Sequence, residues 1–319
     1  MRFDTRVTRL FGIEVPIIQG PMAWLSEARL VAAVSNEGGL GVLGASLMSV
    51  AEFEQQVEAA AALTQKPFAV NFPLVLADYT EHLEMVLRHG VRIVFTSAGS
   101  PRKFTARIKE AGALCVHVVP SLKHALTAIE AGVDAVVLES VEAGGHVSAE
   151  GITGFTNIPN VRRHVEVPLI AAGGIVDGRG MAAAMCLGAD GIQMGTRFLA
   201  TQECNGHPTY KELLLKAGEL DTPLHSRQWH PGRALRSPVV DQVLQMERDG
   251  RTIEEVRAVI GRGRARKAAH DGNLAEGMFF AGAGAALIRD VPTVKDLFAR
   301  ILREYDECLQ EARARAGLA

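Results

Sequence analysis

Residues 134–140 (DAVVLES), 167–174 (VPLIAAGG) and 188–196 (GADGIQMGT) decide the fold of this chain. Each segment is a short apolar run that ends in small or polar residues, mostly glycine. Strands that are apolar on both faces are typical of a parallel sheet covered by helices. A glycine at a strand end lets backbone N–H groups approach a ligand, because no Cβ intervenes. These segments therefore predict parallel strands whose ends form a binding site.

The same pattern recurs on the amino-terminal side of residue 134. Similar runs are PIIQG (16–20), LGVLG (40–44), FAVNF (68–72), RIVFT (92–96) and LCVHVV (114–119). Helical or loop segments alternate with them, so eight strands are complete by Met194. Eight alternating units favour a closed (β/α)₈ barrel over an open doubly wound sheet. We predict an α/β fold of the TIM-barrel class.

The chain changes character after residue 198. Polar loops and short amphipathic helices follow, and a glycine-rich return leads to a closing amphipathic helix. An insertion of this length with its own helices is typical of a lid over a barrel mouth. We predict that residues 1–205 and 272–319 form the barrel. Residues 206–271 are then a helical cap on the substrate side, inserted after the eighth strand.

The composition is that of a soluble globular protein, with 319 residues, 48% hydrophobic and 22% charged. The formal net charge of -2 favours neither nucleic acid nor an anionic membrane as a partner. The charged N-terminal segment lacks the apolar core of a signal peptide. The four cysteines are scattered, which predicts neither a metal site nor a disulfide framework. We expect a cytoplasmic protein with a small-molecule substrate, and a homodimer is compatible with this composition.

Glycines follow the predicted seventh and eighth strands, at Gly173-Gly174 and Gly195-Thr196. In (β/α)₈ barrels the loops after these two strands frequently bind phosphate. Backbone N–H groups and the Thr196 hydroxyl would be the donors. Either pair by itself could be an ordinary turn. Two pairs at these strands together favour a phosphate-bearing cofactor.

His146 is the candidate proton-transfer residue. It follows the sixth strand, sits beside Gly144 and Gly145 and precedes a polar loop, so we expect it on the functional rim. An imidazole titrates near neutral pH and can take or give one proton. The alternative is a histidine that only hydrogen-bonds the loop backbone or the cofactor.

Asn71 and Glu139 place polar groups at the ends of otherwise apolar strands. Buried polar groups need partners, which could be a heterocycle edge or ligand hydroxyl groups, or other residues of the rim. Asp177 is expected to cap a helix, and Arg197 to pair with a carboxylate at the rim. Histidines in predicted helices, His82 among them, are expected at the surface.

Together these motifs resemble the FMN-dependent nitronate monooxygenases and the related FMN-dependent enoyl-ACP reductases. The resemblance extends from about residue 8 to residue 298. The motifs that carry it are PIIQGPMAW (16–24), EGGLGVLG (37–44), KPFAVNF (66–72), EAGGH (142–146), AAGGIVDGRG (171–180) and QMGTRF (193–198). The resemblance implies a flavin-binding barrel with a helical substrate-side domain.

The resemblance also implies roles for individual residues. His146 matches the family histidine near substrate and flavin. The implied FMN-binding residues are Pro21, Met22 and Ala23 against the isoalloxazine ring, Asn71 hydrogen-bonded to it, Glu139, Ala143 and Gly144 along its side, and Gly173, Gly174, Gly195 and Thr196 around the phosphate.

Three functions are compatible with this sequence. The main prediction is oxidation of alkyl nitronates with O₂ to carbonyl compounds and nitrite, using FMN. The alternative is NAD(P)H-dependent reduction of an enoyl thioester on ACP or CoA. The third is a barrel that binds a phosphorylated metabolite without catalysis. Pro21, where the reductases often have glycine, and Val147-Ser148 after the histidine are departures that bear on the substrate rather than on flavin binding.

Overall fold

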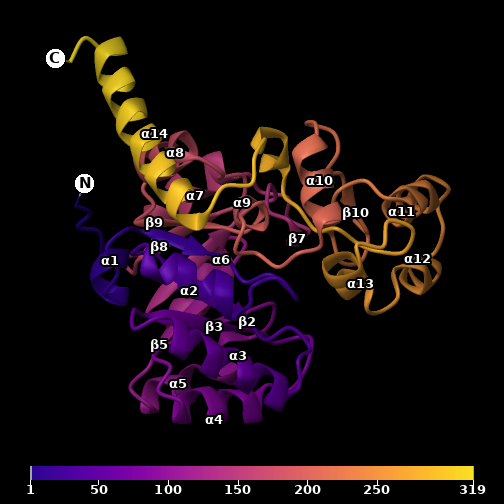
Figure 1. The fold of residues 1–319 in the computed structure, drawn as a ribbon, viewed down its shortest axis with the longest axis horizontal. Helices are drawn as coiled ribbons and strands as arrows, with labels where there is room; N and C mark the ends of the chain where they lie inside the picture. The colour runs from indigo at the N-terminus through magenta and orange to yellow at the C-terminus, as the bar shows by residue number, and fades with distance from the viewer. Residues whose placement is uncertain (1, 319) are drawn as a thin grey trace.

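The computed structural model describes residues 2–318 and contains a closed barrel of parallel strands (Figure 1). β1 pairs with β9 and closes the sheet, with Gln19 opposite Met194. The predicted (β/α)₈ barrel is therefore confirmed. In their order around the sheet, the barrel strands are β1 (Ile17–Gln19), β2 (Leu40–Gly44), β3 (Phe68–Pro73), β4 (Ile93–Ser97), β5 (Leu114–Val119), β6 (Ala135–Glu139), β8 (Leu169–Ala172) and β9 (Gly191–Met194).

Two apolar cores hold the barrel together. Side chains such as Val42 and Phe95 fill its interior. Helix α1 (Arg6–Phe11) adds to this core, with the Phe11 ring centroid 6.1 Å from that of Phe95. A second core lies between the sheet and the surrounding helices. These helices and turns are α2 (Ala28–Asn36), α3 (Val50–Leu63), α4 (Thr80–Arg88), η1 (Pro101–Lys103), α5 (Thr105–Glu110), α6 (Leu122–Glu130), α7 (Gly154–Arg162), α8 (Gly178–Cys186), α9 (Thr196–Leu199), η2 (Ala283–Leu287) and α14 (Val294–Arg315).

The segment inserted after β9 contains helices and two short strands. β10 (Leu224–His225) and β11 (Gly232–Arg233) form a small sheet with β7 (Gly145–His146), which lies in the loop after β6. None of these strands is predicted from the sequence, because two residues leave no periodic signal. The inserted helices are α10 (Pro208–Lys216), α11 (Pro238–Arg248), α12 (Ile253–Ile260) and α13 (Arg264–Asp271).

Figure 1 shows α11, α12 and α13 grouped at one side of the molecule, beyond β7 and β10. The opposite side carries α14, which packs on α8. Among residues 2–318, no helix combines the length and the apolar character needed to cross a membrane.

Two local predictions near the rim are confirmed. The Asp177 carboxylate accepts a 2.7 Å hydrogen bond from the Gly180 N–H and so caps α8. The Arg197 Nη1 lies 3.2 Å from Asp290 Oδ1, which is the predicted ion pair. Both contacts fix the chain just beyond the glycine turns that follow β8 and β9.

The prediction that His82 lies at the surface is wrong. This side chain is buried, with Nε2 2.9 Å from the Met48 carbonyl oxygen and the ring packed near Phe72 and Tyr79. The reason is that His82 falls on the apolar stripe of α4, next to Leu83.

Candidate active site

All the residues predicted to form the site lie at one end of the barrel. Because the strands are parallel, their carboxyl ends share one rim, which carries the functional loops of such barrels. Asn71 lies on β3 and Glu139 ends β6. The other residues follow the ends of β1, β6, β8 and β9, and they are Pro21, Met22, Ala23, Ala143, Gly144, His146, Gly173, Gly174, Gly195 and Thr196. The topology brings all of them to this rim.

The turn after β8 presents free backbone donors. Gly173 and Gly174 both have positive φ angles, of 98° and 75°. Their N–H groups have no acceptor among residues 2–318. Successive backbone N–H groups in a turn can form a concave anion-binding site. A Cβ on Gly173 would lie 2.3 Å from the Ser140 Oγ, so this turn requires glycine.

The end of β9 is joined to a segment distant in the sequence. The Gly282 N–H donates a 2.9 Å hydrogen bond to the Thr196 hydroxyl. The Ala283 N–H donates to the Glu142 carbonyl oxygen, also at 2.9 Å. The chain before η2 therefore lies against the loops that follow both β6 and β9. No role is predicted from the sequence for this AGAGAAL segment (281–287). Its run of small residues is the signal, since small residues let two backbones approach closely.

Two buried amide side chains near the rim have oxygens without partners. Asn71 Oδ1 and Gln193 Oε1 accept no hydrogen bond from the described residues. The Asn71 Nδ2 donates to the Ser97 Oγ at 3.4 Å. Buried polar atoms nearly always have a partner, so these oxygens indicate polar atoms of a ligand or of bound water. Gln193 is not among the site residues predicted from the sequence, although a polar side chain in the apolar run GIQM is a signal for it.

Glu139 has a perturbed carboxyl group. Burial raises its pKa to about 8, because the charged carboxylate loses its hydration. Within residues 2–318 no charged or hydrogen-bonding partner offsets that effect. The carboxyl group is therefore mostly protonated at neutral pH. In that state it can donate a hydrogen bond to a ligand at the end of β6.

The His146 ring lies near two other rings of the rim. Its centroid is 6.1 Å from that of His230 and 5.5 Å from that of Phe280. Although the side chain is exposed to solvent, the surrounding protein lowers its pKa by desolvation, and the charge of His230 adds to this effect. The imidazole is therefore neutral at physiological pH and can accept a proton.

Backbone pairing with the inserted segment holds His146 in place. His146 lies directly opposite Gly232 of β11, and the Val147 N–H donates to the Pro231 carbonyl oxygen at 2.9 Å. The Arg233 guanidinium donates to the Val141 carbonyl oxygen at 3.1 and 3.0 Å. The position of the candidate base thus depends on residues that lie far from it in the sequence.

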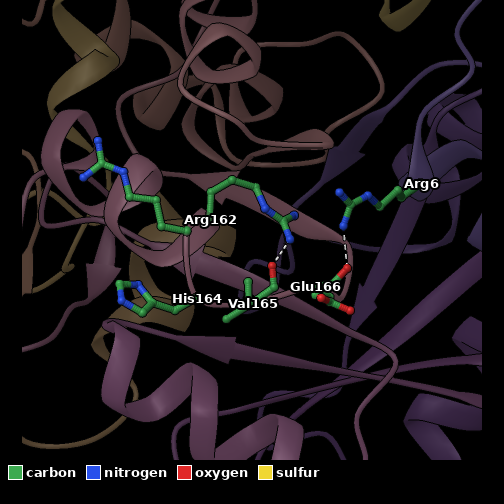
Figure 2. Close-up of a pocket in the computed structure, with 6 residues that line it drawn as sticks. Arg6, Arg162, His164, Val165 and Glu166 are labelled. Atoms are coloured by element: carbon green, nitrogen blue, oxygen red, sulfur yellow. Dashed lines mark hydrogen bonds between the residues drawn. The ribbon is translucent and has the colours of Figure 1, made fainter.

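A separate cavity of about 680 Å³ lies at the opposite end of the barrel. Figure 2 shows the Arg162 side chain directed at the Val165 carbonyl oxygen and Arg6 directed at Glu166. Arg162 also pairs with Asp190 at 3.1 Å. These guanidinium groups already bind carbonyl and carboxylate oxygens, and the amino-terminal end of such barrels serves stability. The cavity therefore does not belong to the candidate site.

Comparisons with known proteins find relatives of nearly the whole chain. The family profile described as nitronate monooxygenase matches residues 4–82 and 73–304. A (3aS,4S,5R,7aS)-5-hydroxy-7a-methyl-1-oxo-octahydro-1H-indene-4-carboxyl-CoA dehydrogenase from Mycobacterium tuberculosis is 33% identical, over 98% of this chain and 99% of its own.

Two solved structures are similar to the chain over nearly its full length. FabK from Thermotoga maritima has a TM-score of 0.93 at 38% identity, over 98% of this chain and 99% of its own. A nitroalkane oxidase from Streptomyces ansochromogenes has a TM-score of 0.83 at 27% identity, over 97% of this chain and all of its own. The similarity includes the inserted segment as well as the barrel, because the coverage is nearly complete in both directions.

Proposed function

Because this chain belongs to the nitronate monooxygenase family, we propose that it is an FMN-dependent oxidoreductase that oxidises alkyl nitronates with O₂. The products are a carbonyl compound and nitrite. When bound, FMN accepts electrons from the substrate and passes them to oxygen, while the protein supplies binding, orientation and proton transfer. The observation that carries this proposal is the free pair of N–H groups at Gly173-Gly174 on the same rim as His146.

The polar groups of the rim suit a flavin mononucleotide. The N–H groups of Gly173 and Gly174 are donors for a phosphate, which needs no positive side chain when several backbone donors converge. Asn71 Oδ1 is a buried acceptor without a partner and suits the N–H of a heterocycle. The implied phosphate-binding residues are Gly173, Gly174, Gly195 and Thr196, and those around the ring are Pro21, Met22, Ala23, Asn71, Glu139, Ala143 and Gly144.

His146 handles the substrate proton in this proposal. Its lowered pKa keeps the imidazole neutral near pH 7, so it can remove the α-proton of a neutral nitroalkane. Once protonated, the same ring can donate a hydrogen bond to a nitronate oxygen. The rings of His230 and Phe280 lie beside the His146 ring, with centroid distances of 6.1 and 5.5 Å.

The inserted residues 206–271 form the substrate-side cap in this proposal. The pairing of β10 and β11 with β7 supports it, because that small sheet joins the insertion to the loop that carries His146. Residues 1–205 and 272–319 would then form the FMN-binding barrel. Limited proteolysis with and without substrate tests the cap, since cleavage within 206–271 should slow when substrate is bound.

A second candidate is redox chemistry on an acyl thioester. The whole-length similarity to a carboxyl-CoA dehydrogenase favours it. The same rim would serve, because the flavin and His146 are common to both candidates. The difference lies in the electron donor, which would be a nicotinamide nucleotide or the thioester itself.

Anaerobic reduction of the flavin-loaded protein separates the two candidates. Propyl-2-nitronate, NADH, NADPH and a saturated acyl-CoA are each mixed with the protein, and flavin absorbance is followed. We expect the nitronate to bleach the flavin without nicotinamide, and nitrite to accumulate when air is admitted. Bleaching by NADH or NADPH with recovery on an enoyl thioester, or bleaching by acyl-CoA, together with no response to the nitronate, would overturn the main proposal.

A further inference from the structure

Three residues form a row across the small sheet beside the candidate site. His225 of β10 lies directly opposite Gly232 of β11, and Gly232 lies directly opposite His146 of β7. Both pairs are antiparallel, and directly opposite residues in an antiparallel sheet project to the same face. His225 and His146 therefore lie on one face of this sheet, with only a glycine between them.

The ring of His225 occupies the space that a side chain at Gly232 would need. A Cβ built on Gly232 would lie 2.8 Å from His225 Cε1 and 3.0 Å from His225 Nε2. The distal edge of the imidazole thus lies over the middle strand, on the side towards β7. Any residue larger than glycine at this position would push the ring away from that place.

The nitrogen at this distal edge has no partner. His225 is only 3% exposed, yet its Nε2 has no hydrogen-bond partner in the described part of the chain. Its Nδ1 lies 2.9 Å from the hydroxyl of Ser226, a residue held at a φ of 58°. A positive φ is unusual for serine and is retained where the surrounding structure requires it. The Ser226 contact fixes the His225 ring with its Nε2 beside Gly232.

We propose that His225 is a positioning residue for His146, whose ring does not contact His225 Nε2 in the structure but would donate a hydrogen bond to it when turned about its side-chain torsions toward Gly232. This contact would fix which His146 nitrogen faces the substrate. It requires the tautomer of His225 in which Nδ1–H donates to the Ser226 hydroxyl and Nε2 carries the lone pair. The inference rests on the proposed function only in the assumption that His146 handles the substrate proton.

The charges around His146 agree with this arrangement. Burial, with the nearby His146 as a smaller cause, lowers the pKa of His225 to about 4, so His225 stays neutral and can accept at any pH where the enzyme works. His230 is the other titratable group that faces His146. Arg233, on the paired strand, donates to the Val141 and Thr222 carbonyl oxygens and lies near Glu142. An acceptor stabilises the imidazolium, whereas His230 destabilises it.

Because His225 and His230 are expected to shift the pKa of His146 in opposite directions, replacing each in turn gives a test with an internal control. His225→Leu removes the acceptor at nearly constant volume, and His225→Gln supplies an amide oxygen instead. His230→Leu is the matched control, because His230 is the other histidine near the His146 ring. The pKa of His146 is measured by NMR titration of ¹⁵N-histidine in the flavin-loaded protein, and kcat is measured against pH with the nitronate and with a neutral nitroalkane.

We expect His225→Leu to lower the pKa of His146 by about one unit, the size expected for losing one hydrogen bond to a charged group. Its kcat with the neutral nitroalkane should fall about tenfold. His225→Gln should leave the pKa of His146 and kcat close to their wild-type values. His230→Leu should raise the pKa of His146. If His225→Leu does not fold, Ser226→Ala should shift the pKa of His146 in the same direction by a smaller amount.

An unchanged His146 titration in His225→Leu, or in Ser226→Ala where that variant replaces it, would overturn the inference and leave His225 a packing residue. The NMR measurement does not depend on the reaction. A shifted pKa without nitronate oxidation would therefore reject the proposed function and keep the role of His225. Nitronate oxidation with an unshifted pKa of His146 would keep the proposed function and reject the role of His225.

Discussion

The glycine turn after β8 and the histidine row beside β7 are built in different ways. Gly173 and Gly174 lie in one short turn, and the contacts that shape it come mainly from the neighbouring loop after β6. The row of His225, Gly232 and His146 joins two segments far apart in the sequence through a three-stranded sheet. In the proposed function, FMN binding and proton transfer therefore depend on separate parts of this rim, and of the four predictions that follow, those for His146, Gly174 and Asp177 test that separation.

The largest expected effect is on turnover when His146 is replaced. His146→Ala should lower kcat for a neutral nitroalkane by about 100- to 10,000-fold, the usual contribution of a positioned general base. Bound FMN, measured by absorbance per chain, should stay at the wild-type level because the glycine turn is untouched. The nitronate, which has already lost its α-proton, should be affected much less than the nitroalkane. Equal losses on both substrates would remove proton abstraction from the role of His146.

The second effect concerns the glycine turn and has a matched control. Gly174 and Gly90 have nearly equal φ angles, 75° and 76°, but a Cβ at Gly90 would meet no atom within 4 Å. Alanine at either position should therefore cost about 1–2 kcal/mol of unfolding free energy through backbone strain. A Cβ at Gly174 would lie 3.2 Å from Glu142 Cβ and would displace the turn with its N–H donors. Gly174→Ala alone should therefore weaken FMN binding, by about a hundredfold if both charge-assisted hydrogen bonds are lost. Fluorescence titration measures this, and equal FMN affinity in both variants would rule out a phosphate at this turn.

The third effect follows from Glu139 and appears in the pH dependence of stability. Its pKa is raised to about 8 in the folded chain and is near 4.5 when unfolded. Between these values the folded state holds one proton more, so its stability falls as pH rises. Each unit of pKa shift corresponds to about 1.4 kcal/mol of unfolding free energy. Because the Glu139 side chain is partly accessible to solvent, the full value is not expected. We expect the unfolding free energy to fall by roughly 2 kcal/mol between pH 5 and 9, relative to Glu139→Gln. Urea unfolding of the FMN-free proteins measures it, and parallel pH curves would contradict the raised pKa.

The smallest effect separates helix capping from phosphate binding. Asp177 follows the glycine turn and caps α8 through the Gly180 N–H. Asp177→Ala should cost about 1 kcal/mol of unfolding free energy, the usual value for such a cap. FMN affinity should change by less than about twofold, since the carboxylate is not a phosphate donor. A large loss of FMN would show that the cap and the turn form one unit.

Much of the fold and of the rim could be predicted from local sequence. The run AAGGIVDGRG specifies a strand end, a turn that needs positive φ angles and a capped helix within a few residues of one another. Repetition of this strand–turn–helix pattern predicts the barrel, and parallel strands then place Asn71, Glu139 and His146 on one rim. The roles of these residues in FMN binding and proton transfer remain predictions.

The sequence by itself determined the barrel, its functional rim and the glycine turn, because each depends on the conformational preferences of adjacent residues. Only the tertiary structure decided that His82 is buried, that Gln193 presents an unpartnered oxygen, and that His225 lies across a glycine from His146. The apolar stripe of α4 and the run GIQM carry local signals for His82 and Gln193, but the contacts of these side chains, and the position of His225, depend on how distant segments pack.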